Sequence, residues 1–161
     1  MKTHALLNYL VGNWAGNGRG YFPTISSFEY RETVVFTWRD QTTLFFDQRT
    51  EKRYNAGEPF EVSHWESGFI RILDNDQLEM INAQSGGRAE VLTGHVIASA
   101  PQIELHFTST QEINDARMIA TSRTFQVTET QLNYQMWMHT TTVDHIQPHL
   151  EAVLSRSERN I

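Results

Sequence analysis

The sequence has no cysteine, no cluster of basic residues and no long apolar run. The absence of cysteine among 161 residues excludes disulfides, thiolate metal sites and a thiol nucleophile, and it fits a reducing compartment. The net charge of -6 argues against partners with anionic surfaces, namely nucleic acids and anionic membranes. The apolar run between Met1 and Leu10 is too short for a signal peptide or a membrane span. We therefore expect a soluble, cytoplasmic protein.

Strand-like segments with alternating apolar residues dominate the chain, and a helical period is almost absent. Turn signals recur roughly every ten to fifteen residues, without an internal repeat, linker or low-complexity segment. Because closure removes exposed edges, we predict an all-β fold: a single domain, 1–161, forming an antiparallel up-and-down β-barrel of about ten strands. A barrel of this size tends to hold one small ligand. The predicted strands after the first are 28–38, 44–53, 60–73, 78–82, 89–99, 103–110, 117–128, 131–142 and 149–156.

The first predicted strand lies in a glycine-rich stretch that a proline ends. Gly16, Gly18 and Gly20 recur at the strand period, so all three lie on one face. This pattern favours a bent first strand, with Trp14 closing the bottom of the core, over a strand that contacts a ligand.

Two smaller features modify the barrel. The spacing of Ala5, Leu6, Tyr9 and Leu10 predicts a short helical turn that packs as a plug over one open end. Gly68, inside a long predicted strand, predicts a bend or bulge at that point.

Three histidines, His139, His145 and His149, lie close together in the sequence MHTTTVDHIQPHL. Imidazole is the commonest metal ligand, so the three could bind zinc or iron, although their spacing matches no compact motif. The alternative is a loop that carries surface histidines.

A second polar cluster, His64-Trp65-Glu66, lies inside a predicted strand. The glutamate could orient the histidine by a hydrogen bond if a bend brings both side chains to one side. Met136 and Met138 share a face and could either line an irregular apolar ligand or fill the core. The sequence shows no persuasive nucleophile–base pair, nucleophile elbow or phosphate-binding loop.

Three motifs, at the beginning, middle and end of the chain, resemble those of one family. They are Gly12–Ile25, GNWAGNGRGYFPTI; His64–Arg71, HWESGFIR; and Gln147–Leu154, QPHLEAVL. Together they resemble the nitrobindins, which are small β-barrels, similar to fatty-acid-binding proteins, that bind haem b. The resemblance spans nearly the whole chain. The family is associated with nitric oxide binding and with the isomerisation of peroxynitrite to nitrate by ferric haem.

The resemblance implies one haem b per chain and assigns residues around it. His149 would be the proximal axial ligand of the haem iron, and Thr24 would contact the porphyrin. His64 and Ser63 would line the distal side, and Met138 would lie near the haem. The implied function is that of a haem-dependent peroxynitrite isomerase or, without turnover, of a nitric oxide-binding protein.

The alternation around His149 conflicts with a regular strand. In a regular strand, Glu151 would lie on the same face as His149, and the apolar Ala152 would lie on the opposite face. Either His149 lies at the rim of the barrel, where polar neighbours are tolerated, or a bulge intervenes.

Two other functions remain open. The barrel could carry a hydrophobic or fatty-acid-like ligand without redox chemistry, with Arg71 and Arg123 as candidates to bind its carboxylate. A non-haem metal could instead be held by His139, His145 and His149. A homodimer, formed through an outer sheet face, also stays open.

Overall fold

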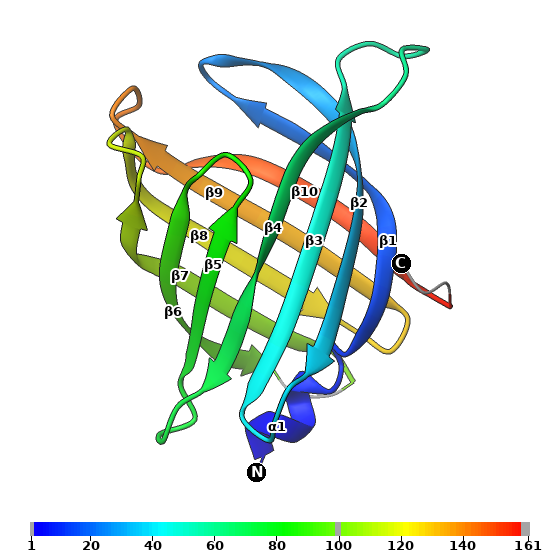
Figure 1. Cartoon of the computed structure of the whole chain (residues 1–161), viewed down its shortest axis with the longest axis vertical. Helices are drawn as coiled ribbons and strands as arrows, with labels where there is room; N and C mark the ends of the chain where they lie inside the picture. The colour runs from blue at the N-terminus through cyan, green and yellow to red at the C-terminus, as the bar shows by residue number, and fades with distance from the viewer. Residues whose placement is uncertain (1, 99–100, 159–161) are drawn as a thin grey trace.

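The computed structural model describes residues 2–98 and 101–158 and is a closed antiparallel barrel (Figure 1). The short helix α1 (Lys2–Leu7) comes first. Ten strands follow: β1 (Gly12–Phe22), β2 (Ile25–Trp38), β3 (Thr43–Arg53), β4 (Glu61–Ile72), β5 (Leu78–Gln84), β6 (Ala89–Ala98), β7 (Ile103–Ile113), β8 (Met118–Val127), β9 (Gln131–Thr140) and β10 (Gln147–Ser157). Each strand pairs with its successor in the chain, and β1 closes the barrel by pairing with β10. The predicted all-β, up-and-down barrel of about ten strands is confirmed.

The predicted start of the second strand needs correction. β2 begins at Ile25 rather than at Phe28, because Pro23 and Thr24 alone form the turn after β1. The predicted strand end at Ser99 lies outside the described residues.

The bend or bulge that was predicted at Gly68 of β4 is not observed. Gly68 pairs in regular register with Phe46 on one side and with Asn82 on the other. The register instead shifts where Thr50 of β3 faces His64, which leaves Ser63 as an extra residue. Gly68 is required for another reason, since a Cβ atom there would lie 2.0 Å from the carbonyl oxygen of Ile81.

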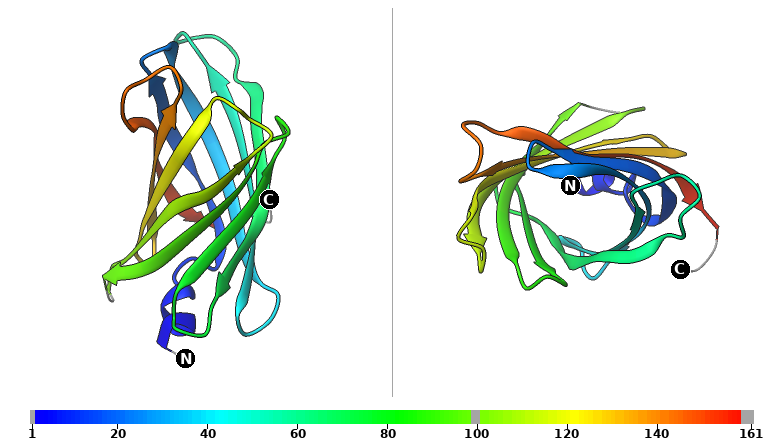
Figure 2. Two further views of the ribbon diagram at one scale, coloured as in Figure 1. Left: turned by 90° about the vertical axis from the view of Figure 1, so that its left-hand side faces the viewer. Right: turned by 90° about the horizontal axis from the view of Figure 1, so that it is seen from above.

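The helix closes one end of the barrel, as predicted (Figure 2, right). Of the four residues in the predicted apolar face, Leu6, Tyr9 and Leu10 pack in or against the core. Leu7 and Leu10 are completely buried, whereas Ala5 is exposed. Trp14 is also completely buried and donates a hydrogen bond from Nε1 to the carbonyl oxygen of Leu10, at 2.7 Å. Trp14 therefore closes the bottom of the core, as predicted. Within the described ranges, no helix has the length and apolar character needed to cross a membrane.

The interior is divided into layers along the barrel axis. Buried apolar side chains, among them Phe36, Ile70 and Leu92, fill the end next to α1. The middle layer is buried but polar, and consists of Glu32, Gln48, Glu66, Asn82, Glu90, Thr121 and Arg123. The end opposite α1 contains a cavity. The polar layer therefore forms the floor of that cavity.

Gly16 allows β1 to approach β10 closely, and Gly16→Ala is expected to destabilise the barrel by about 1–3 kcal/mol. A Cβ atom at this position would lie 2.1 Å from the carbonyl oxygen of Val153, which is backbone and cannot rotate away. Urea unfolding measures the loss. Gly86→Ala is the control, because no atom lies within 4 Å of a Cβ atom there. Equal stability of the two variants would contradict this explanation.

Candidate functional site

A cavity of about 330 Å³ opens at the end of the barrel opposite α1. Its lining comes from the β5–β6 and β7–β8 turns and from the adjacent ends of several strands. Apolar lining is provided by Phe28, Met136, Met138 and Leu150. Polar and charged lining is provided by Gln48, Ser63, His64, Glu66, Arg88, Arg117 and His149. The volume lies within the usual range for small-molecule sites.

His149 enters the cavity wall through a bulge. The register between β10 and β9 shifts between Pro148 and Leu150, so His149 is the extra residue. Of the two alternatives that the alternation left open, the bulge is observed. It allows His149 to line the cavity while Ala152 remains buried in the core.

The ring of His149 is fixed by its neighbours in β1. Its Nδ1 atom lies 3.0 Å from the carbonyl oxygen of Tyr21, and its ring meets that of Phe22 edge-on at 5.7 Å between centroids. A carbonyl oxygen can only accept, so Nδ1 carries the proton and Nε2 keeps a free lone pair. This is the tautomer that binds a metal through Nε2.

The environment also keeps His149 neutral. Burial lowers the pKa of His149 below its ordinary value, and the hydrogen bond to Tyr21 opposes this only in part. The charges of Arg88 and His64 lower the pKa further. A neutral imidazole is the form that ligates iron, so the site needs no deprotonation step near neutral pH.

The structure brings together four of the five predicted site residues. His149, His64, Ser63 and Met138 all line the cavity. Thr24 does not line it, because it lies in the exposed turn between β1 and β2. That turn directly follows the segment of β1 that holds His149, and the role of Thr24 stays a prediction.

The floor of the cavity contains an ion cluster that sequence reasoning missed. Arg123 donates to both oxygens of Glu66, at 2.5 and 3.0 Å, and also to Glu90. Glu66 in turn lies 3.5 Å from Nε2 of His64. No bend is needed to bring His64 and Glu66 together, because residues two apart in a strand point to the same side. That spacing was the available signal, and it was overlooked.

The alternative ligand sets are not assembled. His139 contacts the carbonyl oxygen of Val143, and His145 contacts the side chain of Gln147. The part of the chain that the structure describes has no group of three metal-ligating side chains, so the alternative of a metal held by His139, His145 and His149 is contradicted.

The predicted arginine pair for a fatty-acid carboxylate is not formed either. Arg71 is half exposed on the outer face and pairs with Glu79, at 2.7 Å. Arg123 is buried but is already neutralised by Glu66 and Glu90.

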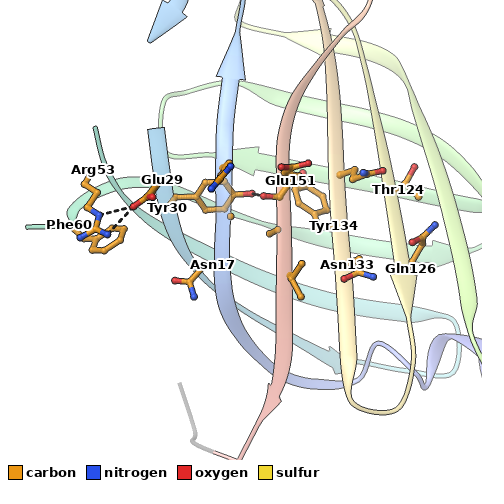
Figure 3. A pocket seen from close by; sticks show the side chains of 15 residues that line it. Asn17, Glu29, Tyr30, Arg53, Phe60, Thr124, Gln126, Asn133, Tyr134 and Glu151 are labelled. Carbon is orange, nitrogen blue, oxygen red and sulfur yellow. Dashed lines mark hydrogen bonds and ion pairs between the residues drawn. The ribbon is translucent and has the colours of Figure 1, made fainter. Parts of the chain in front are cut away.

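A larger hollow, of about 830 Å³, lies along β1, β10, β9 and β8 (Figure 3). Amide side chains, including Asn17 and Asn133, account for much of its polar lining. The close-up also shows the Tyr30 hydroxyl meeting the backbone of Glu151, to whose carbonyl oxygen it donates. None of the 15 lining residues is a histidine, methionine or cysteine. Burial raises the pKa of its two tyrosines, Tyr30 and Tyr134, so neither readily forms the phenolate that could bind haem iron.

The residues of the smaller cavity fit a haem group. His149 offers one imidazole lone pair, and Phe28, Met136, Met138 and Leu150 offer an apolar surface for a flat macrocycle. Two guanidinium groups, Arg88 and Arg117, line the same cavity and could meet carboxylates. The donor set, not only the shape, therefore matches a haem with one axial histidine.

Comparison with known proteins supports a haem-binding barrel. A family model described as a THAP4-like, heme-binding beta-barrel domain matches residues 4–156. The protein named peroxynitrite isomerase Rv2717c from Arabidopsis thaliana is 36% identical over 152 residues, covering 94% of this chain and 87% of that protein. Peroxynitrite isomerase 2 from Mycobacterium ulcerans is 33% identical over 150 residues, covering 91% of this chain and 90% of that protein.

Solved structures share the fold of this chain. The crystal structure of Rv2717c from M. tuberculosis superposes with a TM-score of 0.85 at 29% identity, covering 98% of this chain and 99% of that chain. An S-type phycobiliprotein lyase, CPES, from Guillardia theta reaches a TM-score of 0.62 at 10% identity, covering 99% and 95%, and shares the fold alone. The resemblance to the nitrobindins is confirmed. With a matched region that spans nearly every described residue, the chain belongs to the family of THAP4-like, haem-binding β-barrel domains.

Proposed function

We propose that the chain binds one haem b through Nε2 of His149 and isomerises peroxynitrite to nitrate at the open side of the iron. The observation that carries the proposal is the hydrogen bond from Nδ1 of His149 to the Tyr21 carbonyl, which leaves Nε2 as the free ligand atom in the cavity wall. The relatives named peroxynitrite isomerase support the choice of reaction. Nitric oxide, as a small neutral ligand, would bind at the same open position.

The chain's own residues would hold the haem and shape its surroundings. His149 would supply an imidazole ligand, and Met136, Met138 and Leu150, which line the cavity, would supply apolar contacts that exclude water from the macrocycle. Ferric haem, when bound, would supply a Lewis-acidic, redox-active iron. Isomerisation breaks the O–O bond of peroxynitrite and forms an N–O bond of nitrate, and it consumes no net electron or proton. The protein therefore needs no external reductant.

A haem titration of the apoprotein, followed by absorbance in the Soret region, tests the cofactor part of the proposal. We expect saturation at one haem per chain, and an affinity loss greater than about tenfold in His149→Ala, since loss of even an outer partner of a metal ligand costs this much. His145→Ala is the matched control, because His145 is exposed and does not line the cavity. Unchanged affinity and spectrum in His149→Ala would refute the axial assignment.

Stopped-flow mixing of the ferric protein with peroxynitrite tests the reaction. We expect faster decay than in buffer, with nitrate as the product, and loss of the acceleration in His149→Ala. Haem binding without faster peroxynitrite decay would show that the chain binds haem but is not a peroxynitrite isomerase. Cytoplasmic location and a homodimer stay predictions.

A further inference from the structure

A buried ion cluster connects three strands beneath the cavity. Arg123 of β8 is 1% exposed and bridges Glu66 of β4 and Glu90 of β6, which are 3% and 0% exposed. Its bonds to Glu66 form a two-pronged contact, with Nη1–Oε1 at 2.5 Å and Nη2–Oε2 at 3.0 Å. Such a fork fixes both the position and the plane of the carboxylate. Glu66 is therefore held rigidly although it lies in the floor of a cavity.

The two carboxylates of this cluster differ in what they face. Glu66 lines the cavity, and its Oε2 atom lies 3.5 Å from Nε2 of His64. Glu90 does not line the cavity and instead accepts hydrogen bonds from the side chains of Asn82 and Thr121. Burial alone would raise the pKa of Glu66, but the charge of Arg123 outweighs it and lowers the pKa to about 2. Glu66 thus presents a permanent negative charge to His64.

The position of His64 is fixed independently by the backbone. The bulge at Ser63 sets the direction of the side chain, and the Thr50 hydroxyl donates to the carbonyl oxygen of His64, at 3.3 Å. The ring itself is about one third exposed, so it can exchange protons with solvent. His64 is therefore held in place without being sealed off.

The other carboxylate, guanidinium and imidazole groups that line the cavity are those of Arg88, Asp115, Arg117 and His149. Arg117 is bound to Asp115, at 3.0 Å, and Arg88 lies 3.5 Å from Glu90. Among the described residues, Glu66 is the one carboxylate that lies within ion-pair distance of the His64 ring. The carboxylate that the His64 ring faces is therefore that of Glu66.

We propose that Glu66, held by Arg123, is a positioning residue that lets His64 take up a proton when a small anion enters the open side of the haem. An imidazolium has two N–H donors, so one can face Glu66 while the other meets the anion. The proton comes from solvent, and its charge balances that of the anion. A neutral ligand such as nitric oxide gains nothing from this arrangement. The proposal rests on the proposed function and adds a preference of the site for anions.

The functional test measures azide and nitric oxide affinities of the haem-loaded protein at pH 7. Azide is the anionic probe and nitric oxide the neutral one. In Glu66→Gln we expect azide affinity to fall by about tenfold, the effect of removing one opposite charge at this range, and nitric oxide affinity to be unchanged. Glu90→Gln is the matched control, because it also takes one carboxylate from Arg123 but does not face His64. An equal azide loss in both variants would overturn the proposal.

A double-mutant cycle separates positioning from general damage. His64→Gln should lower azide affinity as Glu66→Gln does, and adding Glu66→Gln to it should have no further effect. His64→Gln also serves if Glu66→Gln fails to fold, because the His64 side chain is partly exposed. Wild-type azide affinity in His64→Gln would refute the role of His64.

A measurement without haem keeps this proposal distinct from the proposed function. In the apoprotein, nitrogen NMR of the His64 ring should show Nε2 protonated in the wild type and in Glu90→Gln, and a mixture of tautomers in Glu66→Gln. The same ring state in all three proteins would show that Glu66 does not position His64. A failed haem titration with the expected ring states would instead refute only the proposed function.

Discussion

Replacing Arg123 with methionine is expected to lower the free energy of unfolding by about 3–5 kcal/mol. Arg123 is completely enclosed, and it neutralises two carboxylates that have almost no access to water. Removing the guanidinium leaves Glu66 and Glu90 as uncompensated buried charges. Protonation of these two carboxylates at low pH would relieve the repulsion between them. The loss in free energy of unfolding should therefore be smaller at pH 4 than at pH 7.

Urea unfolding at the two pH values measures the effect of Arg123→Met. Arg71→Met is the control, because its partner Glu79 lies on the outer face and the loss of an exposed pair costs less than about 1 kcal/mol. The triple variant Arg123→Met, Glu66→Gln, Glu90→Gln should recover much of the stability, since no charge remains in the layer. A loss below about 1 kcal/mol at pH 7, as in the control, would show that the cluster is hydrated rather than buried.

Glu32→Gln is expected to stabilise the barrel increasingly as the pH rises. Burial raises the pKa of Glu32 from 4.5 to about 8, and a hydrogen bond with Gln48 reduces the shift only in part. Between these values the folded chain holds a proton that the unfolded chain has lost. Between pH 4.5 and about 8, the free energy of unfolding of the wild type therefore falls by roughly 1.4 kcal/mol per pH unit because of Glu32. The stabilisation from the protonated Glu32 is fully present only below pH 4.5. Glutamine has no proton to lose, so the variant escapes this loss.

Thermal or urea unfolding from pH 5 to pH 9 measures the difference between Glu32→Gln and the wild type. The difference should be small near pH 5, grow towards pH 8 and then level off. Glu29→Gln is the matched control, because Glu29 lies on the same strand but is exposed and pairs with Arg53. A difference that stays constant across this range would contradict a protonated Glu32 in the folded state.

The barrel could be predicted because its signals are local. Alternation in each segment fixes which side chains point inward, and turn residues fix where each strand ends. The role of Trp14 followed from its place on the glycine face of the first strand. Even the bulge at His149 was accessible, since a regular strand would have put a polar histidine and the buried Ala152 on opposite faces.

The polar layer could not be predicted, because its contacts join residues far apart in the chain. Glu66 and Arg123 are separated by 57 residues, and Arg123 and Glu90 by 33. Alternation indicates that these side chains point inward, but not that they meet at one height in the barrel. The prediction of the plug was correct for Leu6, Tyr9 and Leu10, but it included the exposed Ala5 and missed the buried Leu7.

Resonance Raman spectroscopy of the ferrous haem-loaded protein tests the central claim most directly, because it detects the bond between iron and an imidazole nitrogen. We predict an iron–histidine stretching band in the wild type, its loss in His149→Gly and its return when free imidazole fills the space left by the ring. A band that persists in His149→Gly without imidazole would show that another residue binds the iron.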